Sequence, residues 1–175
     1  MLFKKQKIKG LLLITPEPFK DNRGLFRRVF CQNELRKKKL NFRIKQINIS
    51  ENKNIYTLRG FHYQESPYGE DKIITCIQGK VHNIVIDMRK KSKTFMKWKS
   101  FTLSERNRYA LLVPKGCANA YMTLKKKTWV LYFHSQFYTK SFEKGIKYND
   151  PRFNFNWPNK VKVISDKDNK IEIIK

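Results

Sequence analysis

The stretch from Ile73 to Met88, IITCIQGKVHNIVIDM, contains two apolar runs with three turn-forming residues between them. The runs, residues 73–77 and 81–88, have the length and the β-branched content of β-strands. The segment Gln78-Gly79-Lys80 predicts a tight hairpin that joins them. Similar short apolar runs, separated by turn residues, recur along most of the chain, and this pattern favours many short strands over long helices.

The same pattern predicts the other elements of the fold. Strands are expected over residues 11–15, 25–30, 44–50, 58–64, 98–103, 110–114 and 128–134, and one brief helix over residues 34–39. No segment has the pattern of a ten-residue amphipathic helix with good caps. We therefore predict an all-β barrel or double-sheet jelly roll, with small helices at its periphery.

Two of the expected strands separate their side chains into two distinct faces, because successive residues of a strand point to opposite sides. In residues 44–50, one face carries Gln46, Asn48 and Ser50, and the other carries Lys45, Ile47 and Ile49. In residues 128–134, one face carries Trp129, Leu131 and Phe133, and the other carries Val130, Tyr132 and His134. The first strand therefore points a row of polar side chains in one direction.

Length and charge limit the class of protein. A chain of 175 residues predicts one domain, residues 1–175, that is large enough to bury a core. The 39 Lys and Arg residues against 14 Asp and Glu residues give a net charge of +25, which favours an anionic partner such as nucleic acid, a membrane or a phosphorylated ligand. The basic residues recur in short groups, as in residues 36–39, 89–91 and 125–127, which is typical of a lysine-rich solvated surface.

The cysteines and the apolar runs indicate where the protein works. Cys31, Cys76 and Cys117 are an odd number without close pairing, which favours reduced thiols in a cytoplasmic protein over disulfides or a zinc site. The run from Leu11 to Ile14 is too short for a signal sequence or a membrane span, so no membrane partner is expected.

Patterns that hold common cofactors are missing from the sequence. His62, His82 and His134 lie far apart, without the spacing of a metal site. The chain has no phosphate loop and no dinucleotide fingerprint, and Cys117 has no base beside it, so we expect Cys117 to be a small buried hydrophobe. Acid–base chemistry by His, Tyr, Lys and Asp remains, with no metal and no cofactor.

The segment Leu58–Gln64, LRGFHYQ, resembles the signature LRG-x-H-Y-Q of the dTDP-4-dehydrorhamnose 3,5-epimerase family. Arg59 offers a fork of donors for phosphate, and His62 can accept a proton at neutral pH. The resemblance extends from Pro18 to Asp168. Its further motifs, in the family's order, are Lys72, residues 79–89, 92–95, Trp98, residues 113–116, Tyr132, Tyr138, and residues 143–146, 149–151, 157–158 and 165–168.

The resemblance implies a cupin-type jelly roll that forms a homodimer with strand exchange and uses no metal or cofactor. It implies a nucleotide-linked 4-keto-6-deoxy sugar as substrate, with inversion at C3 and C5. By the same resemblance His62 is the base, Asp168 its carboxylate partner, Tyr132 the acid on the opposite face and Lys72 the cation near the ketone oxygen. The implied substrate-binding residues are Arg23, Gln46, Asn48, Arg59, Tyr138, Glu143 and Lys167.

Two substrate-facing positions depart from the family pattern. Where the family commonly has an Ala-His-Gly-Phe turn, this chain has Ala118-Asn119-Ala120-Tyr121, so Asn119 stands at the position of a histidine. Arg28 stands where many members have a glutamate. The identity of the nucleotide and of the sugar therefore stays open.

Two alternatives also stay open. One is inversion at a single centre, C3 or C5, of a dTDP-, CDP- or GDP-linked sugar. The other is a non-catalytic barrel that binds a sugar nucleotide or nucleic acid through its positive charge. For the epimerase, regular strand alternation would separate Arg59 from His62, so a bulge at Gly60 is expected to bring both to one pocket.

Overall fold

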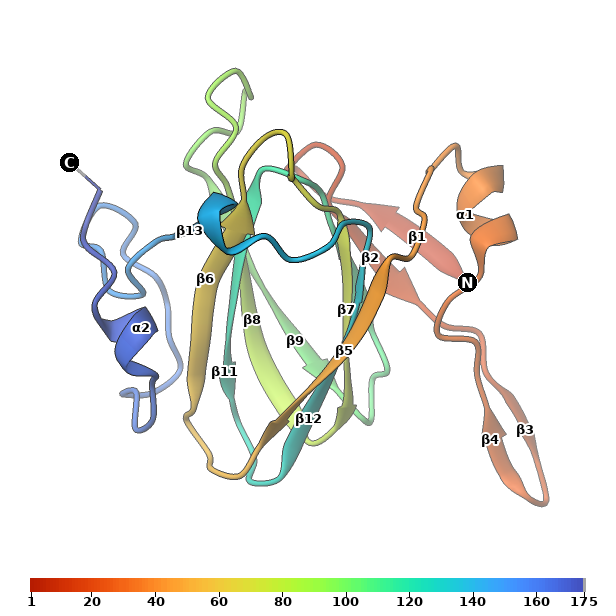
Figure 1. Ribbon diagram of the computed structural model, residues 1–175. Coiled ribbons are helices and arrows are strands. Elements are labelled where there is room, and N and C mark those ends of the chain that lie inside the picture. The colour runs from red at the N-terminus through yellow and green to blue at the C-terminus, as the bar shows by residue number, and fades with distance from the viewer. Residues whose placement is uncertain (175) are drawn as a thin grey trace.

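Two antiparallel sheets form the body of the molecule, which confirms the expected all-β jelly roll of cupin type (Figure 1). This computed structural model describes residues 1–174; Lys175, the last residue of the expected domain, lies outside the described residues. The six-stranded sheet contains, in spatial order, β1 (Leu2–Lys5), β2 (Leu12–Thr15), β10 (Ala110–Val113), β7 (Lys72–Gln78), β12 (Thr128–His134) and β5 (Gln46–Asn52). The five-stranded sheet contains β13 (Glu143–Gly145), β6 (Leu58–Gln64), β11 (Cys117–Thr123), β8 (Lys80–Asp87) and β9 (Trp98–Ser104).

Short elements surround these sheets. A separate ribbon of β3 (Phe19–Asp21) and β4 (Gly24–Phe26) projects away from the body (Figure 1). The helical segments are α1 (Gln32–Lys37), a 3₁₀ turn (Lys140–Phe142) and α2 (Asp166–Asn169). No helix within residues 1–174 is both long and apolar enough to cross a membrane.

The core has three layers because both outer faces of the jelly roll are covered. The inner layer, between the sheets, includes Ile74, Val81, Val85, Val130 and Tyr121. The segment around α1 covers the outer face of the six-stranded sheet, where Leu35 and Phe42 pack near Leu112 and Phe133. The C-terminal segment covers the outer face of the five-stranded sheet, where Phe153 packs near Phe61, Ile84 and Ile86. Most of the apolar surface of both sheets is thereby buried, except on the edge strand β5, where Ile47 and Ile49 remain exposed.

Strand alternation in β5 and β12 follows the prediction. Asn48 and Ser50 of β5 line a cavity between the sheets, to which Ile49 also contributes. Ile47 and Ile49 are 54% and 51% exposed. In β12, Tyr132 and His134 line the same cavity, and Leu131 and Phe133 pack in the outer core. The polar faces of both strands therefore point into one cavity.

The predicted hairpin at residues 78–80 is wrong. β7 pairs with β10 and β12, whereas β8 pairs with β9 and β11, so the two strands lie in different sheets. Both hydrogen-bonding edges of each strand are occupied by these other partners. Gly79, at φ +80°, carries the chain from one sheet to the other, and a Cβ there would lie 2.4 Å from Oγ1 of Thr128.

The strand expected over residues 25–30 is shorter than predicted. β4 ends at Phe26, and Val29 and Phe30 instead pack against the outer core beside α1. The strands β1, β3, β11 and β13 are not predicted by the apolar pattern. Residues 118–121, expected in a turn, lie within β11, a central strand with every residue buried.

The bulge expected at Gly60 is confirmed. In the pairing of β6 with β11, Asn119 lies opposite His62 and Tyr121 lies opposite Arg59, so three steps along β6 match two along β11. Gly60 has a φ of +107°, and a Cβ there would lie 2.5 Å from the carbonyl oxygen of Asn119. The extra residue re-aims the strand, and Arg59 and His62 both line the same cavity.

Candidate active site

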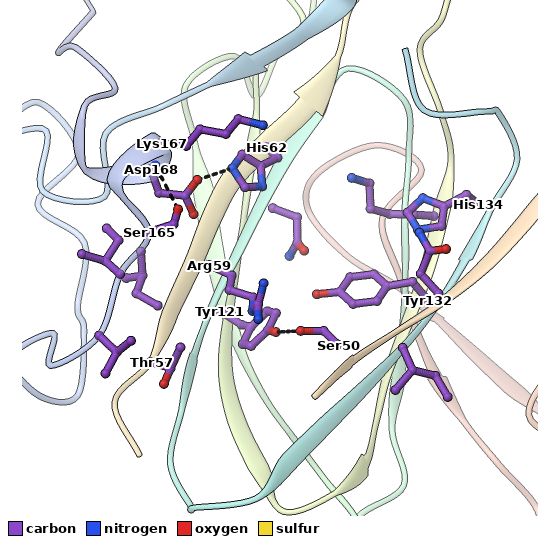
Figure 2. Close-up of a pocket in the computed structure, with 17 residues that line it drawn as sticks. Ser50, Thr57, Arg59, His62, Tyr121, Tyr132, His134, Ser165, Lys167 and Asp168 are labelled. Carbon is purple, nitrogen blue, oxygen red and sulfur yellow. Dashed lines mark hydrogen bonds and ion pairs between the residues drawn. The ribbon is translucent and has the colours of Figure 1, made fainter. Parts of the chain in front are cut away.

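A cavity of about 590 Å³ lies between β5, β7 and β12 on one side and β6, β11 and the segment around α2 on the other (Figure 2). Its lining includes the four expected catalytic residues His62, Lys72, Tyr132 and Asp168. It also includes the expected substrate-binding residues Asn48, Arg59, Asn119 and Lys167. Residues that are far apart in the sequence thus meet at one site.

His62 and Asp168 form an imidazole–carboxylate pair on one wall of the cavity (Figure 2). Nε2 of His62 lies 2.8 Å from Oδ1 of Asp168, and Oδ2 accepts a hydrogen bond of 3.0 Å from the backbone N–H of Gly60. Burial alone would raise the pKa of Asp168, but the hydrogen bonds from His62 and Gly60 lower it overall. Because an ionised carboxylate only accepts hydrogen bonds, Nε2 carries a proton and Nδ1 is left to act as a base.

The local sequence around α2 fixes this carboxylate. Oγ of Ser165 accepts a hydrogen bond of 3.2 Å from the backbone N–H of Asp168 and thereby caps the helix. Asp168 is only 4% exposed, although the polar C-terminal segment in which it lies resembles a solvated tail in sequence.

Tyr132 lies on the wall opposite His62 (Figure 2). Burial raises the pKa of its phenol well above the usual value, and the neighbouring Tyr121 raises it further. The phenol is therefore protonated at neutral pH and can donate a proton. Its ring stacks on the ring of His134, with 5.7 Å between centroids and an angle of 18° between planes.

Lys72 enters the cavity wall from the first position of β7. Its Nζ lies 3.0 Å from Oε1 of Glu70, and the second carboxylate oxygen of Glu70 lies 2.7 Å from Nδ1 of His134. Burial alone would raise the pKa of Glu70, but contacts with His134 and Lys72 lower it overall. A buried carboxylate thus holds the amino group of Lys72 at the cavity wall.

The guanidinium of Arg59 is held in the cavity by a hydrogen bond to Asn52, which in turn contacts Tyr121. Nε of Arg59 donates to Oδ1 of Asn52 over 2.9 Å, and Nδ2 of Asn52 donates to Oη of Tyr121 over 3.2 Å. Oη of Tyr121 also lies 2.8 Å from Oγ of Ser50 (Figure 2). These contacts leave the terminal nitrogens of the guanidinium to bind an anion.

Asn119 has a defined orientation. Its Nδ2 donates to Oδ1 of Asn83 over 2.8 Å and to the carbonyl oxygen of Ile84 over 3.2 Å. Both amide hydrogens are therefore used, and Oδ1 remains as a hydrogen-bond acceptor.

The expected residues Gln46, Tyr138 and Glu143 lie beside the cavity rather than in its lining. Oε1 of Gln46 accepts from the backbone N–H of Tyr138 over 3.0 Å, and Oη of Tyr138 donates to Oε2 of Glu143 over 2.8 Å. The same carboxylate oxygen pairs with Nζ of Lys167. Burial would raise the pKa of Glu143, but Lys167 and Tyr138 lower it overall.

Arg23 and Arg28 are not brought to this cavity. Arg23 lies at the tip of the ribbon, where its side chain is 83% exposed and pairs with Asp21 at 2.6 Å. Arg28 pairs with Glu34 at 2.8 Å near α1. Within one copy of the chain, the expected substrate-binding role of Arg23 and Arg28 at this cavity is therefore not supported.

Several lining residues were not expected from the sequence. They are Ser50, Thr57, Tyr121, His134 and Ser165, together with Glu70 behind the lining. A signal for His134 was present, because strand alternation places it on the same face as Tyr132. Within residues 1–174, no group of three or more His, Cys, Asp or Glu residues is arranged to hold a metal ion.

The fold and the site define a class of protein: a jelly-roll enzyme whose cavity brings together side chains suited to acid–base chemistry. His62 and Tyr132 face each other across the cavity (Figure 2). Lys72, the cross-strand partner of His134, lies on the same wall as Tyr132. The family model described as dTDP-4-dehydrorhamnose 3,5-epimerase matches residues 5–175. The chain belongs to this family.

Individual relatives agree with this assignment. The chain is 36% identical over 169 residues to a dTDP-4-dehydrorhamnose 3,5-epimerase of Sinorhizobium fredii, covering 96% of this chain and 87% of the relative. It is similar to the crystal structure of the Bacillus anthracis enzyme with TDP and PPi bound, with a TM-score of 0.96, 31% identity and 99% of each chain covered. It is also similar to the Legionella pneumophila enzyme in complex with dTDP-4-keto-L-rhamnose, with a TM-score of 0.92, 29% identity, and 98% and 92% coverage.

Proposed function

We propose that this chain inverts C3 and C5 of a dTDP-linked 4-keto-6-deoxy sugar by proton abstraction and reprotonation, in the biosynthesis of an activated deoxysugar. The observation that carries the proposal is the His62–Asp168 pair facing Tyr132 across one cavity. A non-catalytic barrel would need neither a carboxylate-paired imidazole nor a buried phenol opposite it.

Proton abstraction follows from the chemistry of the ketone. The C4 ketone acidifies the hydrogens on C3 and C5, because the electron pair left after deprotonation delocalises onto the ketone oxygen. Nδ1 of His62 accepts the proton, and Asp168 stabilises the imidazolium that forms. Lys72, at the cavity wall, stabilises the negative oxygen of the enolate.

Reprotonation from the other face produces the inversion. Tyr132 donates its phenolic proton to the carbon on the face opposite His62, and the enolate electron pair forms the new C–H bond. This step leaves a phenolate and an imidazolium, and exchange with water restores both groups. Two such cycles invert the two centres.

The diphosphate and the sugar are bound by groups around the catalytic pair. Arg59 and Lys167 offer positive charge to the diphosphate, and Asn48 and Asn119 offer hydrogen bonds to the sugar. Tyr138 stacks on the nucleotide base, with Gln46 and Glu143 holding it in place. Oδ1 of Asn119 accepts a hydrogen bond from a sugar hydroxyl, since both of its amide hydrogens are used.

We also propose a homodimer in which the β3–β4 ribbon is exchanged. The ribbon projects from the body and carries two exposed aromatic residues, Phe19 at 65% and Phe26 at 75%. Apolar side chains of this size on a projecting ribbon favour a partner surface. Exchange would bring Arg23 from one copy to the active site of the other, with Arg28 near the same interface.

Residues 1–175 are proposed to act as one domain in the cytoplasm. The shared inner core of the two sheets supports a single domain. The three unpaired cysteines support a reducing compartment, and Cys117, only 1% exposed, is the small buried hydrophobe that its sequence context predicts.

Deuterium exchange in heavy water tests the reaction and its substrate together. The protein is incubated with dTDP-, CDP- and GDP-linked 4-keto-6-deoxy sugars, and deuterium at C3 and C5 is measured by NMR and mass spectrometry. We expect incorporation at both carbons of the dTDP-linked sugar. Incorporation at one carbon would establish a single-centre epimerase, and no incorporation in any substrate would overturn the proposed function.

A further inference from the structure

The cavity contains a second imidazole–carboxylate pair, formed by His134 and Glu70, on the wall opposite His62. Oε2 of Glu70 lies 2.7 Å from Nδ1 of His134, and Oε1 lies 3.0 Å from Nζ of Lys72. The side chains of Glu70, Lys72 and His134 are 9%, 8% and 12% exposed. The buried carboxylate of Glu70 therefore contacts both the amino group of Lys72 and the imidazole of His134.

Backbone pairing holds these three residues in place. Lys72 of β7 and His134 of β12 are direct cross-strand partners, so their side chains share the cavity face. Glu70 lies two residues before Lys72, in a loop tied to β12 at Ser135. The backbone N–H of Asp71 donates to Oγ of Ser135 over 2.8 Å, and the backbone N–H of Ser135 donates to the carbonyl oxygen of Asp71 over 3.0 Å.

The second ring nitrogen of His134 extends this group of contacts to Asn48. Because the carboxylate of Glu70 only accepts, Nδ1 of His134 donates to it, and Nε2 of the ring faces Asn48. Nε2 lies 3.4 Å from Nδ2 of Asn48. This contact turns Oδ1 of Asn48 away from His134. A continuous series of contacts thus runs from Lys72 through Glu70 and His134 to Asn48.

We propose that Glu70 and His134 are positioning residues of the epimerase: Glu70 holds the amino group of Lys72 beside the ketone oxygen, and His134 orients Asn48. The inference rests on the proposed function and deepens it. Glu70 acts on the step in which negative charge develops on the substrate, so its effect belongs to kcat. His134 contacts both Glu70 and Asn48, so its loss should lower kcat through Glu70 and raise KM through Asn48.

Substitutions that each preserve a different contact separate these roles. In Glu70→Gln the side chain keeps its shape but loses the negative charge that pairs with Nζ of Lys72. We expect kcat to fall about tenfold with little change in KM, the size expected for loss of a charged hydrogen bond. Glu105→Gln is the matched control, because Glu105 pairs with Lys125 at 2.9 Å outside the cavity, and its kinetics should match the wild type.

His134 is tested by a pair of variants. His134→Phe keeps a ring against Tyr132 but loses both hydrogen bonds, so kcat should fall and KM should rise. His134→Asn places an amide N–H where Nδ1 lies, which preserves the contact with Glu70 but not that with Asn48. We expect this variant to recover kcat and to keep the raised KM.

Binding of dTDP, measured by calorimetry, completes the experiment, because dTDP lacks the sugar that Lys72 and Asn48 contact. The inference predicts wild-type affinity for dTDP in every variant. Loss of dTDP binding, a wild-type kcat in Glu70→Gln, or equal kinetics of the two His134 variants would each overturn it while leaving the epimerase proposal intact. A wild-type protein without exchange activity would contradict the proposed function and with it this inference.

Discussion

Asp168 has three defined hydrogen-bond partners, and together they determine what His62 can do. The backbone N–H of Gly60 and the ring of His62 use its two oxygens, and Ser165 fixes its backbone. The carboxylate therefore selects the tautomer of His62 that leaves Nδ1 free. The free Nδ1 is a property of the pair rather than of the histidine alone.

Asp168→Asn should inactivate the base without removing any side chain from the site. The amide oxygen would still accept from Gly60, so Nδ2 would donate to Nε2 of His62 and move the ring proton to Nδ1. We expect kcat to fall about a hundredfold or more, the range of general-base contributions. Ser165→Ala is the control; losing the cap should cost stability of about 1 kcal/mol with a much smaller effect on kcat. Steady-state kinetics of the two variants test whether Asp168 orients His62 as the base. A kcat for Asp168→Asn close to wild type would contradict this role.

Asp87 has a structural role and gives a prediction on pH. It is fully buried and accepts hydrogen bonds from Arg89, Ser92 and Thr94. Burial would raise the pKa of Asp87, but these contacts lower it to about 2. Because the folded-state pKa lies below the unfolded value, the stabilisation is complete above pH ~4 and is lost as the pH falls through 2.

This stabilisation amounts to roughly 2 kcal/mol, from the difference between the folded and unfolded pKa values. The free energy of unfolding, measured by denaturant titration between pH 5 and pH 2, should therefore decrease less steeply in Asp87→Asn than in the wild type. Equal pH slopes in the two proteins would show that Asp87 is not the titrating group.

Single residues were predicted to different degrees. His62, Tyr132, Lys72 and Asp168 were identified through a resemblance that spans most of the chain, and the structure brings all four to one cavity. Glu70 was missed because an acidic residue in a turn beside a lysine has the pattern of a solvated surface. Only its pairing in three dimensions shows that it is buried.

The bulge in β6 is the element on which the site geometry depends, and Gly60→Ala tests it. The new methyl group would lie 2.5 Å from the carbonyl oxygen of Asn119, at a φ of +107°. Gly24→Ala controls for the strain of the positive φ, since Gly24 has a φ of +125° and a methyl group added there would have nothing of its own chain within 4 Å. Both variants incur backbone strain of about 1–3 kcal/mol, and only Gly60→Ala adds a clash.

We therefore expect Gly60→Ala to lose more stability than Gly24→Ala in chemical unfolding, and to lose activity because Arg59 and His62 shift relative to each other. Equal losses of stability in the two variants would show that β11 does not approach β6 as closely as the structure has it.

Elements were predicted best where the pattern was strong. The strands over residues 58–64 and 128–134 have the expected bounds. β11 was missed because its sequence, CANAYMT, starts with small residues and an asparagine that are poor strand formers, and burial on both faces overrides that preference. Pairing between strands was the weakest prediction. The turn residues 78–80 favour pairing of β7 with β8, but they do not show that other strands already pair with both edges of each.

At the scale of the whole molecule, the ribbon predicts the oligomeric state. Sedimentation should show a species of twice the chain mass of 21.1 kDa. Replacing Phe19 and Phe26 together by Asp should shift it toward the monomer and reduce kcat/KM, because Arg23 would no longer reach the partner's cavity. Replacing Ile173, which is 52% exposed in the C-terminal segment across the molecule from the ribbon, by Asp is the control (Figure 1). A wild-type monomer with full activity would contradict ribbon exchange.

The central claim is that His62 removes the proton and Tyr132 returns one from the opposite face, and deuterium exchange with stereochemistry measures this most directly. In heavy water, the wild type should place deuterium at C3 and C5 of the dTDP-linked 4-keto sugar with inversion. His62→Ala should place none, and Tyr132→Phe should place deuterium with retention, since His62 still abstracts and returns protons on one face. Exchange by His62→Ala at the wild-type rate, or inversion by Tyr132→Phe, would contradict the account.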